Sequence, residues 1–447
     1  MSDRKRIYLC LAHMSEDGAE QHYVKEAFDT NWVVPLGPNV NGFEKDLEEF
    51  VNDNANPNLN KRVVALSSGT AAVHLGLLSA GVGPGDEVLV QSFTFCASTH
   101  PITYLGAKPI MVDSEEDTWN MDPDLLEEAI IDRIAKTGKK PAAIVPVALY
   151  GMPYKADRIM EIANKYEIPV VEDAAEGFGS KYKGQVLGTF GKYGVLSFNG
   201  NKMITTSGGG ALITANEEEW REIMMYATQY RESYPYYQHE KIGYNYRMSN
   251  ICAGIGRGQM TVINDHLAHH KHVQKMYEEL LADVPGVHVH SQPNNGDYDS
   301  NYWLCTITID ENVKVKGQED AYKTIVTGAV GGAAGVIHAA ESAHTDCEPK
   351  ANVEAMRVAL DKAQIEARPL WKPMHKQPVY CRTMDNGQLI IEKLPNGIIC
   401  QTSDTSVSYI NGVSEALFKI GMCLPAGPYV SDEDVKYIVD MIKENVL

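Results

Sequence analysis

The fold of this chain is decided by one stretch, Ser197-Phe198-Asn199-Gly200-Asn201-Lys202-Met203-Ile204-Thr205-Thr206-Ser207-Gly208-Gly209-Gly210. An apolar strand expected over residues 193–198 leads into it, a short polar loop presents the amine of Lys202, and three glycines follow. A lysine on a polar turn, with backbone free to approach a ligand on both sides, suits the formation of a Schiff base. The alternative is a solvated surface lysine, and three other segments bear on the choice.

The first of these segments is Ser67-Ser68-Gly69-Thr70-Ala71-Ala72, which lies between an expected strand and an expected helix. Small residues let the backbone approach a ligand, and a helix N-terminus offers free N–H groups and the positive end of its dipole. The segment therefore suits an anion site, and we call residues 67–72 the anion cup. The alternative is an ordinary helix cap by Ser68 or Thr70.

The second segment, Gln91-Ser92-Phe93-Thr94-Phe95-Cys96-Ala97-Ser98-Thr99, follows a strand end. An aromatic side chain there can stack on a flat heteroaromatic ring. The alternative, a phenylalanine of the core, is favoured for Phe93, and the segment alone does not single out Phe95.

The third segment, Val170-Val171-Glu172-Asp173-Ala174-Ala175-Glu176, places carboxylates at the end of an apolar strand. A buried aspartate is costly unless it meets a cation. A protonated pyridine nitrogen is one such partner, and pairing increases the capacity of the ring to accept electrons. The alternatives are a salt bridge or a metal, but no His or Cys lies nearby, so we expect no metal site.

From residue 62 onward, short β-branched runs alternate with amphipathic helical segments. We expect strands at 63–66, 87–91, 109–112, 142–147 and 168–172, and helices at 71–80, 122–131 and 154–166. This alternation predicts an α/β fold with a mainly parallel sheet wrapped by helices. In such sheets ligands bind outside the carboxyl ends of the strands, where the four segments fall.

Two domains are expected. The large one spans residues 1–284 and ends with helices at 217–227 and 249–281, the second broken near Gly256-Arg257-Gly258. The smaller, of α+β character, spans 285–447, with its first strand at 302–309. Two stretches of the smaller domain, about 312–352 and 382–410, read as insertions that elaborate the surface.

The composition excludes several classes of protein. Lys+Arg number 40 against Asp+Glu 59 in 447 residues, a formal net charge of -19, which argues against general nucleic-acid binding. The eight cysteines are scattered without a C-x-x-C pair, so reduced thiols are expected rather than disulfides or zinc. No segment has the apolar length of a membrane span or of a signal peptide core, so we expect a cytoplasmic protein without membrane contact.

Taken together, the order of anion cup, ring-stacking aromatic, aspartate and lysine on an α/β sheet resembles the fold-type-I pyridoxal-phosphate (PLP) enzymes. More narrowly, S-G-T-A-A, S-F-T-F-x-A-S, E-D-A-A and S-F-x-x-x-K-x-I-T-T-x-x-G-G resemble the nucleotide-sugar aminotransferases of the DegT/DnrJ/StrS type. The run 243–250, Gly-Tyr-Asn-Tyr-Arg-Met-Ser-Asn, and Leu424-Pro425-Ala426-Gly427 extend the resemblance. It implies a seven-stranded sheet and a homodimer with shared active sites.

The resemblance also implies roles for single residues. Lys202 would bond to PLP, Asp173 would pair with the pyridine nitrogen, and Phe95 would stack on the ring. The neighbouring subunit would supply Asn245. The implied cofactor contacts are Gly69, Thr70, Ala71, Phe95, Asp173, Glu176, Ser197, Lys202 and Asn245. The implied substrate contacts are Arg247, Arg368, Trp371, Lys372 and His375.

Glu176 narrows the resemblance, because many relatives have Gln or His after E-D-A-A. The subset with Glu also carries S-F-N-G-N-K, T-T-S-G-G-G and R-P-L-W-K-P-x-H, all present here. That subset resembles enzymes that aminate C4 of a UDP-linked 4-keto-6-deoxy-N-acetylhexosamine. Arg368, Lys372 and His375 would offer cations to a diphosphate and Trp371 a stacking face, although a solvated basic turn is the alternative.

The expected reaction is a transamination with an amino acid, L-glutamate, as donor and a nucleotide-linked keto-sugar as acceptor. Lys202 would move the proton as a general base. GDP- and dTDP-linked sugars remain alternatives to UDP. A PLP-dependent sugar dehydratase is a rival, but in those relatives histidine replaces the lysine. A non-catalytic PLP-fold regulator is another, but the chain shows no appended DNA-binding segment.

Overall fold

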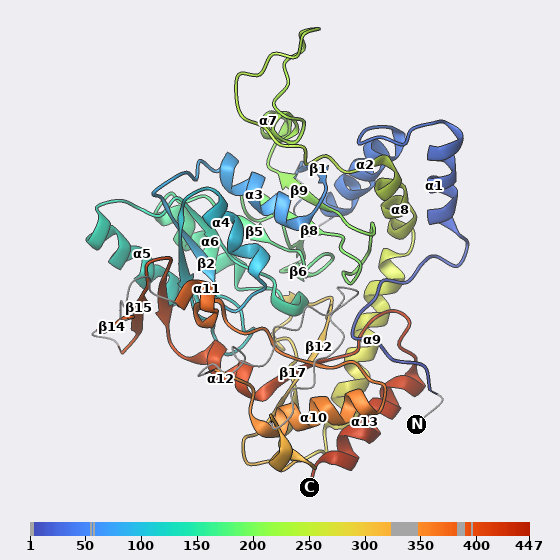
Figure 1. Cartoon of the computed structure of the whole chain (residues 1–447), viewed down its shortest axis with the longest axis vertical. Helices are drawn as coiled ribbons and strands as arrows, with labels where there is room; N and C mark the ends of the chain where they lie inside the picture. The colour runs from blue at the N-terminus through green and yellow to red at the C-terminus, as the bar shows by residue number, and fades with distance from the viewer. Residues whose placement is uncertain (1–3, 54–55, 57–58, 323–346, 382–388, 395–396) are drawn as a thin grey trace.

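The computed structural model describes residues 4–53, 56, 59–322, 347–381, 389–394 and 397–447 (Figure 1). Its centre is a sheet in the order β1 (Arg62–Leu66), β9 (Gly210–Thr214), β8 (Tyr193–Ser197), β5 (Val171–Asp173), β4 (Ala143–Val145), β2 (Glu87–Gln91) and β3 (Lys108–Val112). Parallel bridges Ile144–Val170 and Val147–Asp173 join β4 to β5. Among these seven strands only β9 runs antiparallel to its neighbours, so the mainly parallel α/β sheet is confirmed.

Three further strands extend this sheet beyond β3. β16 (Val407–Ile410) pairs with β3 in parallel, and β15 (Ile399–Thr402) and β14 (Ile390–Lys393) follow in antiparallel order. We expected residues 382–410 to elaborate the smaller domain. The described part of this segment instead completes an edge of the large sheet, where it covers the backbone groups that β3 would otherwise expose.

Helices cover the sheet because their apolar residues follow the helical period. α3 (Gly69–Ser79) is apolar on nearly all sides and is buried from Ala71 to Leu77, as suits a helix enclosed by other elements. α5 (Pro123–Thr137) begins at an Asp122 cap and ends at Gly138, whose φ of 72° is the left-handed value that glycine adopts without strain. The other helices of this part are α1 (Ala19–Asp29), α2 (Pro38–Asn52), α4 (His100–Tyr104), α6 (Ala156–Lys165) and α7 (Glu217–Ala227).

The expected long helix at 249–281 is two helices, α8 (Asn250–Met260) and α9 (Ile263–Leu281). They separate at residues 261–262 and not at the glycines of 256–258, so that part of the prediction is wrong. A Cβ on Gly256 would lie 2.7 Å from the Phe43 ring, and one on Gly258 would lie 2.5 Å from the Glu20 nitrogen. These glycines therefore serve the close packing of α8 against α2 and α1.

The smaller part of the molecule contains an antiparallel sheet in the order β10 (Val287–Val289), β12 (Cys305–Ile309), β17 (Gly421–Leu424) and β13 (Arg368–Pro369). Its first strand is therefore β10, not the expected strand that matches β12. α9, α10 (Ala351–Lys362) and α13 (Asp432–Asn445) pack on it (Figure 1). Since α9 contributes residues to the large core as well, the domain boundary near residue 285 stays a prediction.

The glycine-rich run of the first expected insertion lies outside the described residues. The remaining elements are short: β6 (Lys181–Tyr182), β7 (Gln185–Val186), β11 (Tyr298–Asp299), η1 (Cys96–Ser98), η2 (Leu149–Gly151), η3 (Gln318–Asp320), η4 (Met374–Lys376), α11 (Pro378–Cys381) and α12 (Val413–Ile420). Over the described ranges, none of the helices has both the length and the apolar character needed to cross a bilayer.

Candidate active site

A cavity of about 420 Å³ opens at the carboxyl ends of the parallel strands. Loops after β1, β2, β4, β5 and β8 line it, and two tryptophans come from the region after α9. Its lining contains eight of the residues singled out in the sequence: Gly69, Thr70, Phe95, Asp173, Glu176, Ser197, Lys202 and Trp371. Segments spread over three hundred residues thus meet where α/β sheets bind ligands.

Lys202 projects its amine into this cavity from a tight turn after β8. The Lys202 N–H donates to the Asn199 carbonyl at 2.9 Å, which closes the turn. The amine Nζ lies 3.5 Å from Oε1 of Glu176, and the side chain is only 14% exposed. A sheltered amine at a strand end is available to a carbonyl group of a ligand in the cavity.

Asp173 is the last residue of β5 and is buried. Its Oδ2 accepts from the Ser98 hydroxyl at 2.6 Å, and its Oδ1 accepts from the Ala175 N–H at 3.1 Å. Burial raises the pKa of the Asp173 carboxyl, and the two hydrogen bonds and the Lys202 charge oppose that rise. A cation at this position would stabilise the ionised form, so the site fits a protonated pyridine nitrogen.

Glu176 faces Lys202 from the turn after β5. Its Oε2 accepts from the Tyr150 N–H at 2.7 Å, which leaves Oε1 toward the amine. Burial raises the pKa of the Glu176 carboxyl, and the charge of Lys202 is the largest opposing influence.

The anion cup lies at the N-terminus of α3. A Cβ on Gly69 would lie 2.9 Å from the Ser197 Cβ, so only glycine lets this helix end approach β8 so closely. The Ser68 hydroxyl caps the helix by accepting from the Ala71 N–H at 3.0 Å. Gly69, Thr70 and Ser197 remain in the cavity lining, which fits a phosphate held by a helix N-terminus.

Phe95 and Trp371 form an aromatic wall. Phe95 is 50% exposed, and its ring centre lies 5.3 Å from that of Trp371 at an interplanar angle of 51°. The Trp371 N–H donates to the Tyr150 hydroxyl oxygen at 2.7 Å, which fixes the second ring. An exposed phenylalanine beside the cavity is free to stack on a flat ligand.

Six of the expected contacts lie outside the cavity lining, and Ala71, Asn245 and Arg247 are three of them. Ala71 is buried behind the cup, and Asn245 pairs with Thr228 at the base of the segment between α7 and α8. Arg247 forms a buried ion pair with Glu44 and donates to the Ala65 carbonyl at 3.0 Å. Its expected contact with substrate is thus replaced by a structural pairing.

The basic residues expected to meet a diphosphate differ in their surroundings, and none lines the cavity. Arg368 is 38% exposed and pairs with Glu366, with Nη2 2.6 Å from Oε1, while Lys372 is half-buried. His375 is fully buried and shares a hydrogen bond of 2.7 Å with the Ser92 hydroxyl. Burial lowers the pKa of His375 to about 4, so it cannot supply the positive charge that we expected of it.

Sequence reasoning missed three residues of this site: Ser98, Tyr150 and Trp303. Ser98 bonds to Asp173, Tyr150 bonds to Glu176 and Trp371, and the Trp303 ring lies 4.1 Å from the Lys202 amine. Ser98 lay within a quoted motif, so its position at a strand end was a usable signal. Tyr150 and Trp303 carry no local signal, because only the fold brings them to the cavity.

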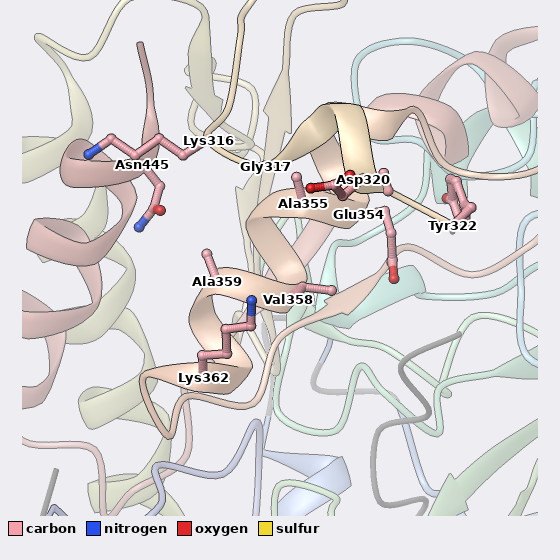
Figure 2. A pocket seen from close by; sticks show the side chains of 11 residues that line it. Lys316, Gly317, Asp320, Tyr322, Glu354, Ala355, Val358, Ala359, Lys362 and Asn445 are labelled. Atoms are coloured by element: carbon pink, nitrogen blue, oxygen red, sulfur yellow. The ribbon is translucent and has the colours of Figure 1, made fainter. Parts of the chain in front are cut away.

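A second cavity, of about 550 Å³, lies in the smaller part between α10 and the turn that contains η3 (Figure 2). Lys316, Asp320, Glu354 and Lys362 are among its lining residues, and none of the residues singled out in the sequence belongs to it. The chemistry expected of this chain therefore concentrates in the first cavity.

Comparison with known proteins identifies the family of the chain. Residues 14–329 match the model of the DegT/DnrJ/EryC1/StrS aminotransferase family. The chain is 38% identical to a Bacillus subtilis (strain 168) protein named as a pyridoxal phosphate-dependent aminotransferase, EpsN, over 98% of this chain and 95% of that one. It is 32% identical to GDP-perosamine synthase of Escherichia coli O157:H7 over 98% of each chain.

A shorter match covers 56% of this chain and 65% of UDP-2-acetamido-2-deoxy-3-oxo-D-glucuronate aminotransferase of Pseudomonas aeruginosa, at 34% identity. Among solved structures, a DegT DnrJ EryC1 StrS aminotransferase from Brucella abortus superposes with a TM-score of 0.75, covering 96% and 95% of the two chains at 24% identity. The sugar aminotransferase Spr1654 from Streptococcus pneumoniae, in its PMP-form, gives 0.75 over 98% and 97% at 24% identity. These structures share the fold.

Proposed function

The chain belongs to the DegT/DnrJ/EryC1/StrS family of PLP-dependent sugar aminotransferases, and from this premise we propose that it transfers an amino group from L-glutamate to C4 of UDP-2-acetamido-4-keto-2,6-dideoxyhexose. The observation that carries the proposal is the cavity in which Lys202, Asp173 and the anion cup face one another. The product would serve the synthesis of a surface polysaccharide or glycan.

In this proposal each side chain has one task. Bound PLP supplies an electron-accepting ring through which an amino acid can lose its α-proton. Asp173 keeps the proton on the ring nitrogen, and Ser98 keeps Asp173 in place. Gly69, Thr70 and Ser197 hold the phosphate. Lys202 would act as the general base, whose amine in its neutral form takes the α-proton of the amino-acid donor.

Phe95 would stack on the cofactor ring, and the sugar would enter beside Trp371, whose aromatic face suits a flat or apolar group. Arg368 and Lys372 supply cations near this wall for a diphosphate. The assignment to UDP rests on the set of Glu176, S-F-N-G-N-K and W-K-P, which resembles the UDP-specific subset.

A GDP-linked 4-keto-sugar is the second candidate acceptor. It is supported by the GDP-perosamine synthase of Escherichia coli O157:H7, which matches nearly the full length of the chain. Transfer of an amine to this acceptor is the same class of reaction, so only the nucleotide carrier and the substituents of the sugar differ.

We further propose a homodimer in which the partner supplies Asn245 to the phosphate. The segment between α7 and α8 supports this, because it extends away from the body of the protein (Figure 1) and carries exposed Tyr236 and Ile242, 70% and 84% exposed. Exposed apolar side chains of this kind favour a protein contact. The cytoplasmic location expected from the sequence stays a prediction.

The test compares acceptors directly. The purified protein with PLP and glutamate is given UDP-, GDP- or dTDP-linked 4-keto-6-deoxysugars, and the products are analysed by mass spectrometry. We expect the UDP-2-acetamido sugar to gain an amine with an equal amount of 2-oxoglutarate. Exclusive use of a GDP- or dTDP-linked sugar would refute the carrier and leave the reaction class standing.

A further inference from the structure

The amine of Lys202 rests in a recess with an aromatic floor and a carboxylate wall. Nζ lies 4.1 Å from the centre of the Trp303 ring and 3.5 Å from Oε1 of Glu176. Trp303 is 2% exposed, so water has little access to the floor. An aromatic face and a carboxylate both attract a cationic amine, and more strongly where water is excluded.

One amide side chain holds both sides of this recess together. Asn301 Oδ1 accepts from the Trp303 N–H at 2.8 Å, and Asn301 Nδ2 donates to the Glu176 carbonyl at 2.9 Å. Gly151 packs on this amide so closely that a Cβ there would lie 1.9 Å from Asn301 Oδ1. The spacing between Trp303 and Glu176 is therefore fixed by built-in contacts.

The Trp303 ring is also tied to the loop that carries the lysine. Its Nε1 donates to the Asn201 carbonyl at 2.6 Å, one residue before Lys202. The ring thus holds both the backbone and the amine of the same turn.

Glu176 is fixed by an unusual backbone conformation. Tyr150 has a φ of 55°, in the left-handed region that costs a non-glycine residue conformational energy, and its N–H reaches Glu176 Oε2 at 2.7 Å. Such strain persists where the surroundings enforce it, and it clusters at functional sites.

Two further ionisable groups face the amine, Asp173 and Cys10. Asp173 is already held by Ser98 and Ala175. Cys10 lies beside Trp303, and burial raises its thiol pKa to about 12, so it stays neutral. Glu176 is therefore the closest anion of the described site to Lys202.

We propose that Trp303 and Glu176 form a receptacle for the protonated amine of Lys202, the position that the amine takes in its cationic form when it is not bonded to the cofactor. This inference rests on the proposed function of Lys202. Trp303 acts as a positioning residue, since it would affect the reaction only through the Lys202 amine that it orients.

The test uses the apo protein and an amine-acetylating reagent at neutral pH. The rate at which Lys202 is acetylated is followed by peptide mass spectrometry, with the well exposed Lys45 as internal reference. We expect Trp303→Leu and Glu176→Gln each to raise the Lys202 rate about threefold to tenfold relative to Lys45. Trp303→Phe keeps an aromatic face and should fall between the wild type and Trp303→Leu.

Glu176→Gln preserves the size of the side chain, so a faster rate there reports the lost charge and not a wider opening. Trp220→Leu is the matched control, because Trp220 also donates to a backbone carbonyl, at 3.0 Å, and also faces a cation, Arg62. It should leave the Lys202 rate unchanged. A wild-type rate in folded Glu176→Gln, or equal rates in the Phe and Leu variants, would overturn the receptacle.

The outcome is separable from that of the proposed function. Attachment of PLP to Lys202 is measured independently, by borohydride reduction of the loaded enzyme. Should PLP fail to attach while the acetylation rates respond as expected, the function falls and the receptacle stands. If PLP attaches to Lys202 but the acetylation rates of the variants do not change, the proposed function stands and the receptacle is refuted.

Discussion

Replacement of Asp173 by asparagine separates two effects of the buried carboxylate. One is its effect on the stability of the protein without PLP, and the other is its contribution to PLP binding and turnover. The carboxyl is buried, and that burial raises its pKa above the usual value near 3.8. A raised folded-state pKa means that the empty protein loses stability as pH rises from about 4 through the folded-state pKa. Asparagine carries no charge, so it removes this loss.

With PLP bound, the carboxylate of Asp173 is favourable, and its replacement weakens binding. A charge-assisted hydrogen bond contributes about 1.5–3 kcal/mol and a neutral one about 0.5–1.5, so the variant should lose roughly 1–2 kcal/mol of PLP binding. That is about five- to thirtyfold in affinity. The loss at the reacting ring should be larger, on the order of 10²–10³ in kcat, because the carboxylate acts on developing charge.

The assay is thermal unfolding of both proteins, with and without PLP, across pH 4 to 8. The empty variant should match or exceed the wild type, and its advantage should grow with pH. Its gain in Tm on adding PLP should be smaller. An empty variant that is less stable than the wild type at pH 7, or an unchanged kcat with PLP bound, would refute this reasoning about Asp173.

The remaining predictions concern the lysine, the dimer and the buried ion pair. Lys202→Ala should lose turnover and covalent attachment of PLP while still retaining PLP by its phosphate, as measured by absorbance; near-normal turnover would contradict the role. Lys202→Ala and Asn245→Asp should each be nearly inactive alone. When the two variants are mixed and exchange subunits, about a quarter of all sites should recover activity, since half the dimers are hybrids with one intact site. Subunit exchange proved by mass, without recovery of activity, would exclude a shared site. Arg247→Met should leave Glu44 buried without its cation and lower the free energy of unfolding by about 3–5 kcal/mol, with little change in KM for the sugar at low temperature; the opposite pattern would restore Arg247 as a substrate contact.

The parts of the fold that local sequence encodes were predictable. Asp173, Ser197 and Lys202 lie at strand ends that apolar runs mark, so their meeting followed from the geometry of a parallel sheet. Glycine was misleading in α8, because Gly256 and Gly258 allow close helix packing and do not end a helix.

Contacts between distant segments could not be predicted from one sequence. The parallel pairing of β16 with β3 joins residues three hundred apart and leaves no periodic signal. Trp303 lies beside Lys202 in a segment that Asn301 anchors through bonds to the carbonyl groups of Glu176 and Phe178. The prediction of a cationic His375 near Trp371 was wrong for a different reason. His375 is buried against Ser92, and the polar character of histidine in the sequence does not indicate that burial.

The central claim is that Lys202 holds the cofactor, and one measurement tests it most directly. The purified protein is loaded with PLP, reduced with borohydride, digested and mapped by mass spectrometry. A single phosphopyridoxyl group on Lys202 is the predicted result. A label on another lysine, or no label in a protein that has bound PLP, would contradict the account.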